Sequence, residues 1–204
     1  MNTDDFSIIQ NVVLSVTGIV GMVIAILGYK EWLKQLKGTD RYNAGKKVIS
    51  ALSDFRDGIE HVRNPFMWTG EFQYTEEESK NITDDIKAKG IERAYSARIK
   101  VLNDARKSLI MALKECEVLQ RLGYIEECKP LLQIYAKVVT AVEMHVEEYH
   151  RGRYMRQESD DDRQWRIQQR EIIYSRMSDK DVINNELKSE IAKLESKIRE
   201  KFGV

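Results

Sequence analysis

The stretch "DDFSIIQNVVLSVTGIVGMVIAILGYKEWLK", residues 4–34, decides how this chain is organised. No residue from Phe6 to Tyr29 is charged. As a helix, this run is roughly 36 Å long at about 1.5 Å per residue, enough to cross the hydrocarbon core of a bilayer. A cleaved secretory signal would begin with basic residues, whereas this run follows Asp4 and Asp5. The run therefore predicts a retained transmembrane helix, with a buried core helix as the alternative.

Basic residues lie only downstream of the predicted span. None precedes it, whereas Lys30, Lys34, Lys37 and Arg41 follow it closely. The positive-inside bias predicts that the amino terminus is outside and that everything after the span is cytoplasmic. Spacings of four, three and four residues place these four cations on one helical face, where they can contact anionic lipid headgroups. A solvated flank without lipid contact is the alternative.

The predicted span carries small and polar residues along one helical face. They are Ser7, Asn11, Ser15, Gly18, Gly21, Ala25 and Gly28. Lipid provides no hydrophobic drive between helices, so close backbone approach at small residues favours helix–helix contact. We expect the section from Ser15 to Gly28 to pack against a second copy or another membrane protein. Glycine is also common in membrane helices without such contacts.

Composition excludes several classes of function. The chain has 33 basic and 33 acidic side chains, and this neutral balance makes nucleic acid an unexpected partner. Phosphate-binding loops, dinucleotide fingerprints and nucleophile elbows are absent from the sequence. Cys116 and Cys128 lack metal-ligand spacing and predict reduced thiols. We therefore expect neither enzymatic activity nor a cofactor.

One pair of residues has the spacing of a metal site. Glu147 and His150 form an E-x-x-H pair, which carboxylate-bridged metal bundles use to direct two ligands inward. Such a site needs a second pair, and no other E-x-x-H occurs. His145 lies on an apolar stripe. The sequence therefore predicts no metal site.

Apolar residues recur at spacings of three and four after the span, and two prolines in the whole chain favour long helices. The three stripes are Val48, Leu52, Phe55, Ile59, Val62; Leu102, Ala105, Leu109, Ala112, Cys116, Leu119; and Leu131, Tyr135, Val138, Val142, His145, Tyr149. They predict an all-α fold in which the transmembrane helix precedes an antiparallel cytoplasmic bundle. The expected sections are an extracytoplasmic tail (1–5), the span (6–29), a juxtamembrane segment with the first cytoplasmic helix (30–63), an aromatic loop (64–83), a helical hairpin (84–157) and C-terminal helices (158–204).

The last expected helix is strongly amphipathic and coiled-coil-like. Ser178 and Asp181 form an S-x-x-D pattern of the kind that caps a helix start. The apolar seam that follows contains Leu187, Ile191, Leu194 and Ile198. At about three heptads it is short for an independent coiled coil. The seam either docks on the bundle or zips to another copy, and the separating "SDKD" favours assembly.

Large aromatic residues gather in the loop that begins at "NPFMWTGEF". Phe66, Trp68 and Phe72 lie among proline and glycine, and large rings dominate the energetics of many interfaces. The loop is therefore a candidate partner-docking surface. The alternative is that its rings fold back and cover the end of the bundle.

These features favour a non-enzymatic, single-pass, membrane-anchored helical scaffold or adaptor. It would assemble through its transmembrane and cytoplasmic helices, as a homo-oligomer or with another membrane protein. The alternative is an oligomeric membrane effector or channel-forming subunit triggered from the cytoplasmic side. In that case Ser7, Asn11 and Ser15 would line a pore.

Overall fold

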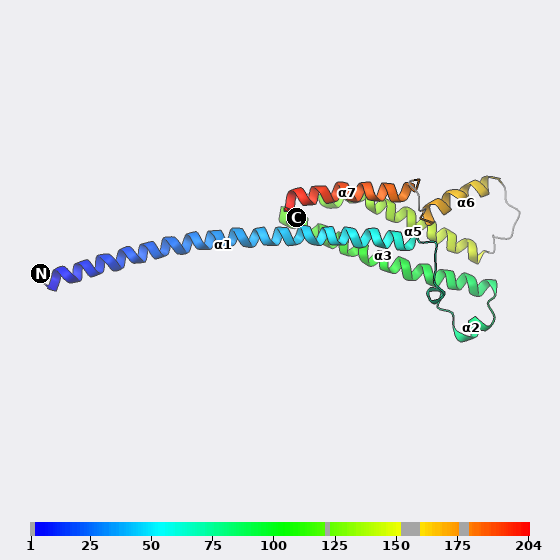
Figure 1. The fold of residues 1–204 in the computed structure, drawn as a ribbon, viewed down its shortest axis with the longest axis horizontal. Coiled ribbons are helices and arrows are strands. Elements are labelled where there is room, and N and C mark those ends of the chain that lie inside the picture. Colours follow the sequence, from blue (N-terminus) through cyan, green and yellow to red (C-terminus); the bar gives the residue numbers. More distant parts are fainter. Residues whose placement is uncertain (1–2, 121–122, 152–159, 176–179) are drawn as a thin grey trace. The chain divides into compact units, whose positions relative to one another are not determined.

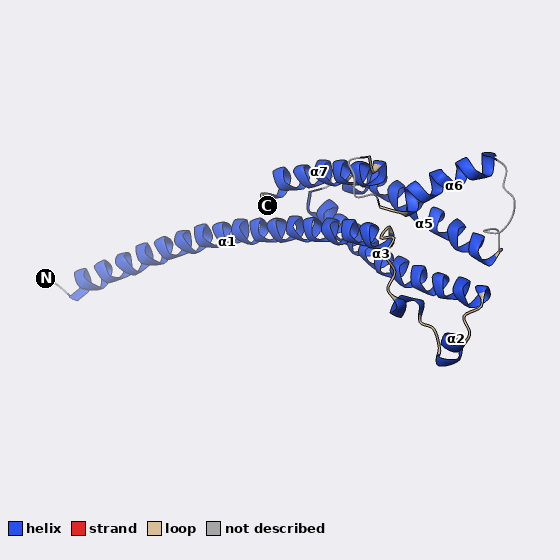
Figure 2. Cartoon of the chain, turned by 45° about the vertical axis from the view of Figure 1, so that its right-hand side comes forward, coloured by secondary structure: helices blue, strands red, loops and turns tan. Residues whose placement is uncertain are grey.

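The computed structural model describes residues 3–120, 123–151, 160–175 and 180–204, and the side chains of residues 14–119, 123–151, 163–175 and 180–204. Every regular element in these ranges is a helix (Figure 2). The predicted all-α class is confirmed. The elements are α1 (Thr3–Val62), the 3-10 helix η1 (Thr69–Phe72), α2 (Glu76–Lys80), α3 (Asp84–Gln120), α4 (Tyr124–Glu127), α5 (Lys129–His150), α6 (Asp160–Ile173) and α7 (Val182–Phe202).

The chain divides into two compact units, Met1–Asn43 and Ala44–Val204, and α1 contributes residues to both. In the first unit, none of the described apolar stretch is buried. Among the described residues, α1 is the one helix that is long and apolar enough to cross a membrane, judged by length and composition. Its insertion and its orientation stay predictions.

Apolar stripes of four helices form the core of the second unit. The buried members are Val48, Leu52, Phe55, Ile59 and Val62 of α1, Leu102, Leu109, Ala112 and Cys116 of α3, Leu131, Val138, Val142 and His145 of α5, and Ile183, Leu187, Ile191, Leu194, Ile198 and Phe202 of α7. Helix α5 packs against α3, α6 and α7 (Figure 1). Leu119 departs from its predicted stripe and is exposed, because it lies in the last turn of α3.

Helix α7 packs within its own chain. Its seam of Leu187, Ile191, Leu194 and Ile198 is buried in the core described above, which is the docking alternative that the sequence left open. The expected cap is shifted, since α7 begins at Val182 and the side chain of Asp181 accepts a hydrogen bond from the backbone N–H of Asn184 at 3.0 Å. Ser178 lies outside the described residues.

Two glycines let helices approach α1 closely. A Cβ added at Gly45 would lie 2.6 Å from Cβ of Phe202, and one at Gly58 would lie 3.1 Å from Cδ1 of Leu102. The contact at Gly45 is too short for a side chain, and the one at Gly58 is tighter than an ordinary van der Waals contact. Gly45 therefore fixes where the end of α7 meets α1, and Gly58 does the same for α3.

Candidate functional site

The aromatic loop between α1 and α3 is held by one buried arginine. Arg98 of α3 is 2% exposed. Its guanidinium donates hydrogen bonds to the carbonyl oxygens of Asn64 and Phe66, both at 2.7 Å, and to that of His61 at 3.2 Å. It also forms a two-pronged pair with the carboxylate of Glu71. Because the buried guanidinium donates to five oxygen atoms in fixed positions, it holds the backbone of this loop in one conformation.

Two glutamates complete the support of the loop. The Glu71 carboxylate accepts from the backbone N–H of Trp68 at 3.0 Å, and the hydrogen bond from Arg98, followed by this one, lowers the pKa of Glu71. Glu78 accepts two hydrogen bonds from Arg93 and one from the N–H of Thr75. The Arg93 guanidinium, as the main cause, lowers the pKa of Glu78 to about 2. Both carboxylates are therefore charged at neutral pH.

The three predicted loop residues divide into two groups. Phe66 is 70% exposed and Trp68 is 80% exposed. Phe72 is half-buried and stacks on Tyr74, with 5.6 Å between ring centroids. Tyr74 in turn lies against α3, because a Cβ at Gly90 would be 2.6 Å from its ring. Phe72 therefore folds back against the helices, which is the alternative that the sequence left open. Phe66 and Trp68 instead face solvent, on a backbone that Arg98 holds in place.

The predicted membrane residues whose side chains the structure describes are exposed. Ser15, Gly18, Gly21, Ala25 and Gly28 contact no core, and a Cβ at any of the three glycines would meet nothing within 4 Å. The side chains of Ser7 and Asn11 lie outside the described ones. The four cations are also exposed, namely Lys30, Lys34, Lys37 and Arg41. The stripe and the basic face are therefore available surfaces of α1.

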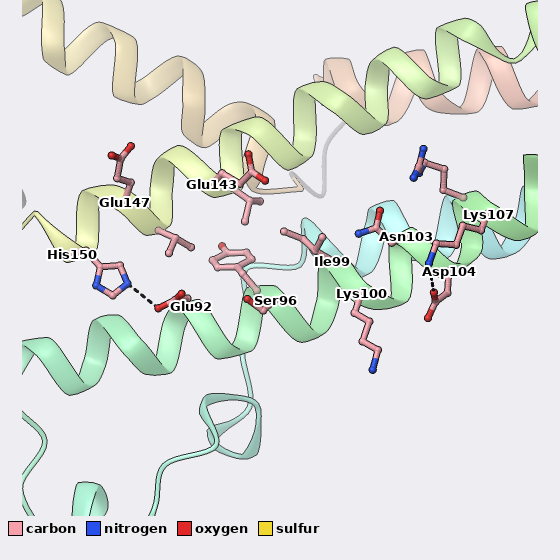
Figure 3. A pocket seen from close by; sticks show the side chains of 14 residues that line it. Glu92, Ser96, Ile99, Lys100, Asn103, Asp104, Lys107, Glu143, Glu147 and His150 are labelled. Carbon is pink, nitrogen blue, oxygen red and sulfur yellow. Dashed lines mark hydrogen bonds and ion pairs between the residues drawn. The ribbon is translucent and has the colours of Figure 1, made fainter.

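Both residues of the E-x-x-H pair have polar partners. His150 Nε2 lies 3.0 Å from the carboxylate of Glu92 on α3 (Figure 3), and Glu147 pairs with Arg151. Among the described residues, no group of three histidine, cysteine or acidic side chains is arranged to hold a metal ion.

A buried aromatic cluster surrounds His145. The Tyr95 and Tyr174 rings each meet the imidazole edge-on at 5.9 Å, and that of Tyr149 does so at 5.1 Å. Tyr174 Oη lies 3.1 Å from His145 Nε2. Burial, with a smaller effect of Arg170, lowers the pKa of His145 to about 4. The imidazole is therefore neutral at pH 7 and serves as a core residue.

Sequence reasoning missed Tyr95 and Arg98 in this region. Tyr95 was identifiable, because it lies one heptad before Leu102 on the same stripe, whereas no apolar pattern marks Arg98. The predicted thiols, by contrast, are both buried, and burial raises the pKa of Cys116 and of Cys128 to about 11. These cysteines are thus poorly reactive at neutral pH.

No protein-family model, curated protein or solved structure matches this chain.

Proposed function

We propose that this protein is a non-enzymatic, single-pass, membrane-anchored helical scaffold or adaptor. Its second unit would be an antiparallel cytoplasmic bundle that presents the Arg98-braced loop to partners. One observation carries the proposal: none of the described apolar stretch of α1 is buried, while residues 44–204 bury a core of their own.

Exposure of this kind is unfavourable in water and favourable in lipid. Leu14, Ile19, Ile24 and Leu27 are each at least 60% exposed, and apolar surface costs about 25 cal/mol per Å² when left in water. A bilayer removes that cost. Tyr29 and Trp32, whose ring centroids are 6.1 Å apart, have the amphipathic character that suits the membrane interface.

Topology provides the first test. A membrane-impermeant thiol reagent should label Asn2→Cys in intact cells, and should label Lys201→Cys only after lysis. The native thiols contribute little background because Cys116 and Cys128 are buried. Labelling of Lys201→Cys in intact cells, with Asn2→Cys protected, would overturn the cytoplasmic assignment.

Assembly through the span provides the second test. Gly21→Ile puts a branched side chain on the exposed small-residue stripe and should weaken association between spans. Val20→Ile, on the neighbouring face, is the matched control. The readout is energy transfer between labelled full-length copies in liposomes. Equal transfer for both variants and the wild type would exclude packing through this stripe.

A channel-forming subunit is the second candidate, because the exposed stripe includes the polar Ser15. Ion flux from liposomes that contain the purified protein separates the two functions. Flux above that of protein-free liposomes would favour the channel. Association without flux supports the scaffold.

A further inference from the structure

The aromatic loop presents two large rings to solvent on a backbone that is held in place. Phe66 is 70% exposed and Trp68 is 80% exposed. Arg98 donates to the Phe66 carbonyl oxygen at 2.7 Å, and the Glu71 carboxylate accepts from the Trp68 N–H at 3.0 Å. Apolar surface left in water costs about 25 cal/mol per Å². Rings that a fixed backbone keeps in water are typical of interface anchors, among which tryptophan is enriched.

The part of the loop that follows the rings is acidic. Residues 64–85 contain six acidic side chains and one basic side chain. Glu76 and Glu77 are exposed in the first turn of α2, and neither pairs with a described cation. Asp84 and Asp85, which begin α3, pair at the surface with lysines one turn further along that helix. Surface pairs of this kind are weak, so the segment keeps a negative potential.

Two arginines of α3 place the rings and the acidic turn next to each other. Arg98 holds the backbone at Phe66, and Arg93 pairs with Glu78 of α2 at 2.8 Å. The two arginines are five residues apart in one helix, which is about 7.5 Å at 1.5 Å per residue. Rings and carboxylates therefore belong to one continuous surface. This acidic–aromatic surface consists of Phe66, Trp68, Glu76 and Glu77.

Charge decides which class of partner fits this surface. Exposed rings can stack on nucleic acid bases or enter a membrane interface, but both partners present phosphates, which the carboxylates repel. A cationic polypeptide is attracted instead, and its arginine or lysine can also lie over the Trp68 ring. We propose that the acidic–aromatic surface binds a basic peptide segment of another protein, with an apolar side chain of that segment packed on the rings. This inference rests on the proposed scaffold function and names the chemistry of its partner.

The size of the surface fits a weak and reversible contact. Two aromatic rings bury about 300–500 Å², and interfaces below about 1,200 Å² are those of transient encounters. Because Arg98 already orders the loop, binding does not have to order it, and the entropic cost of association is lower. Association that depends on exposed charges weakens as the salt concentration rises. The expected interaction is therefore rapid, reversible and sensitive to salt.

Binding of a defined peptide to the full-length protein in nonionic detergent tests the proposal. The probe is a fluorescein-labelled peptide of three Arg-Leu-Gly-Ser repeats, and the control probe has glutamate in place of each arginine. Fluorescence anisotropy at low salt, measured against protein-free micelles, reports binding. The arginine probe should bind at least tenfold more tightly than the glutamate probe. Absence of binding by the arginine probe, or equal or tighter binding of the glutamate probe, overturns the proposal.

A substitution in the ring pair assigns the apolar part of the contact. Trp68→Ala should weaken binding of the arginine probe at least fivefold. Met111→Ala removes a side chain that is 70% exposed on α3 and should change the affinity less than twofold. Both positions are largely exposed, so both variants should keep the wild-type circular dichroism. An unchanged affinity in Trp68→Ala overturns the proposal. Light scattering that shows a lower mass for Trp68→Ala than for the wild type assigns the rings to a second copy and also overturns it.

Neutralisation of the acidic turn assigns the charged part. The double variant Glu76→Gln with Glu77→Gln should weaken binding at least threefold at low salt. The matched control is Asp54→Asn with Glu143→Gln, which removes two exposed carboxylates from α1 and α5. This control should change the affinity less than twofold. An equal loss in both double variants would show attraction to the net charge of the protein and not to this surface, which overturns the proposal.

The outcome is separable from that of the scaffold proposal, because peptide binding in detergent does not depend on topology. Failed peptide binding with a cytoplasmic Lys201→Cys and intact span association would remove this partner class alone. An extracytoplasmic Lys201→Cys would instead overturn the scaffold proposal, whatever the peptide shows.

Discussion

The guanidinium of Arg63 and the carboxylate of Asp181 form a buried ion pair, with 2.9 Å between Nη2 and Oδ1. The two side chains are 0% and 3% exposed. Arg63 also donates to the carbonyl oxygens of Glu171, Ile172 and Tyr174 at the end of α6. Arg63, which directly follows α1, therefore joins the end of α6 to the start of α7.

Arg63→Met should destabilise the protein by about 3–5 kcal/mol, because it leaves the buried Asp181 carboxylate without the positive charge that balances it. Urea unfolding of the full-length protein in detergent, followed by far-UV circular dichroism, measures the effect. Arg56→Met is the control, since Arg56 pairs with Asp57 at the surface and such a loss costs at most about 1 kcal/mol. A cost below 1 kcal/mol for Arg63→Met would show that the buried pair does not form.

His145 makes stability depend on pH. Its pKa in the folded protein is about 4, against an ordinary value of 6.5, so the unfolded chain binds the proton more readily. The contribution of the neutral imidazole to the free energy of unfolding is complete above about pH 6.5 and is lost as the pH falls towards 4. We expect a loss of about 2–3 kcal/mol between pH 7 and 4.5. Urea unfolding at a series of pH values measures it.

His145→Gln should remove this pH dependence, since the glutamine amide can form a hydrogen bond with Tyr174 in either direction but does not ionise. His61→Gln is the control, because His61 is exposed, and it should keep the wild-type profile. If the His145→Gln variant loses as much stability on acidification as the wild type, the pH dependence belongs to other groups.

Apolar spacing identified the buried faces of α1 and α5 but not the buried cations. Val48, Leu52, Phe55 and Ile59 could be read from the sequence because a periodic pattern reports one helix against an apolar neighbour. Arg63 and Arg98 could not, because periodicity counts only apolar residues. Their acceptors are mostly carbonyl oxygens and carboxylates of other elements, which no local pattern specifies.

The candidate loop was predicted from composition alone, and its internal arrangement was not. Phe66, Trp68 and Phe72 look equivalent in sequence. The structure separates them through Arg98, which holds the Phe66 carbonyl, and through Tyr74, which stacks on Phe72. Both partners act through contacts that depend on the position of α3.

Glu71 should stabilise the loop only while it is ionised. The hydrogen bond from Arg98 lowers its pKa below the ordinary 4.5, so its contribution is present above about pH 4.5 and is lost as the pH falls further. Glu71→Gln should cost about 1–3 kcal/mol at pH 7, since Arg98 loses a charged acceptor. The variant should also show a smaller loss between pH 4.5 and 3 in urea unfolding. Glu77→Gln, at an exposed position, should match the wild type, and equal effects of both changes would contradict the brace.

Gly45 should not tolerate even a methyl group. Gly45→Ala brings a Cβ to 2.6 Å from that of Phe202, and relieving such overpacking costs about 1–3 kcal/mol. Gly38→Ala is the matched change in the same helix, where nothing lies within 4 Å. It should stabilise α1 by about 0.5–1 kcal/mol. The unfolding temperatures of the two variants in detergent should therefore shift in opposite directions. Shifts in the same direction would contradict the close contact of α7 with α1.

Leu194 tests whether α7 docks in its own chain. Its side chain is 3% exposed in the core, so Leu194→Asp both creates a cavity and buries a charge without a partner. We expect a loss of at least about 3 kcal/mol in urea unfolding, with no change in the protein mass measured by light scattering in detergent. Val182→Asp is the control, because Val182 is 73% exposed. A lower mass with unchanged unfolding would instead show that the seam joins separate copies.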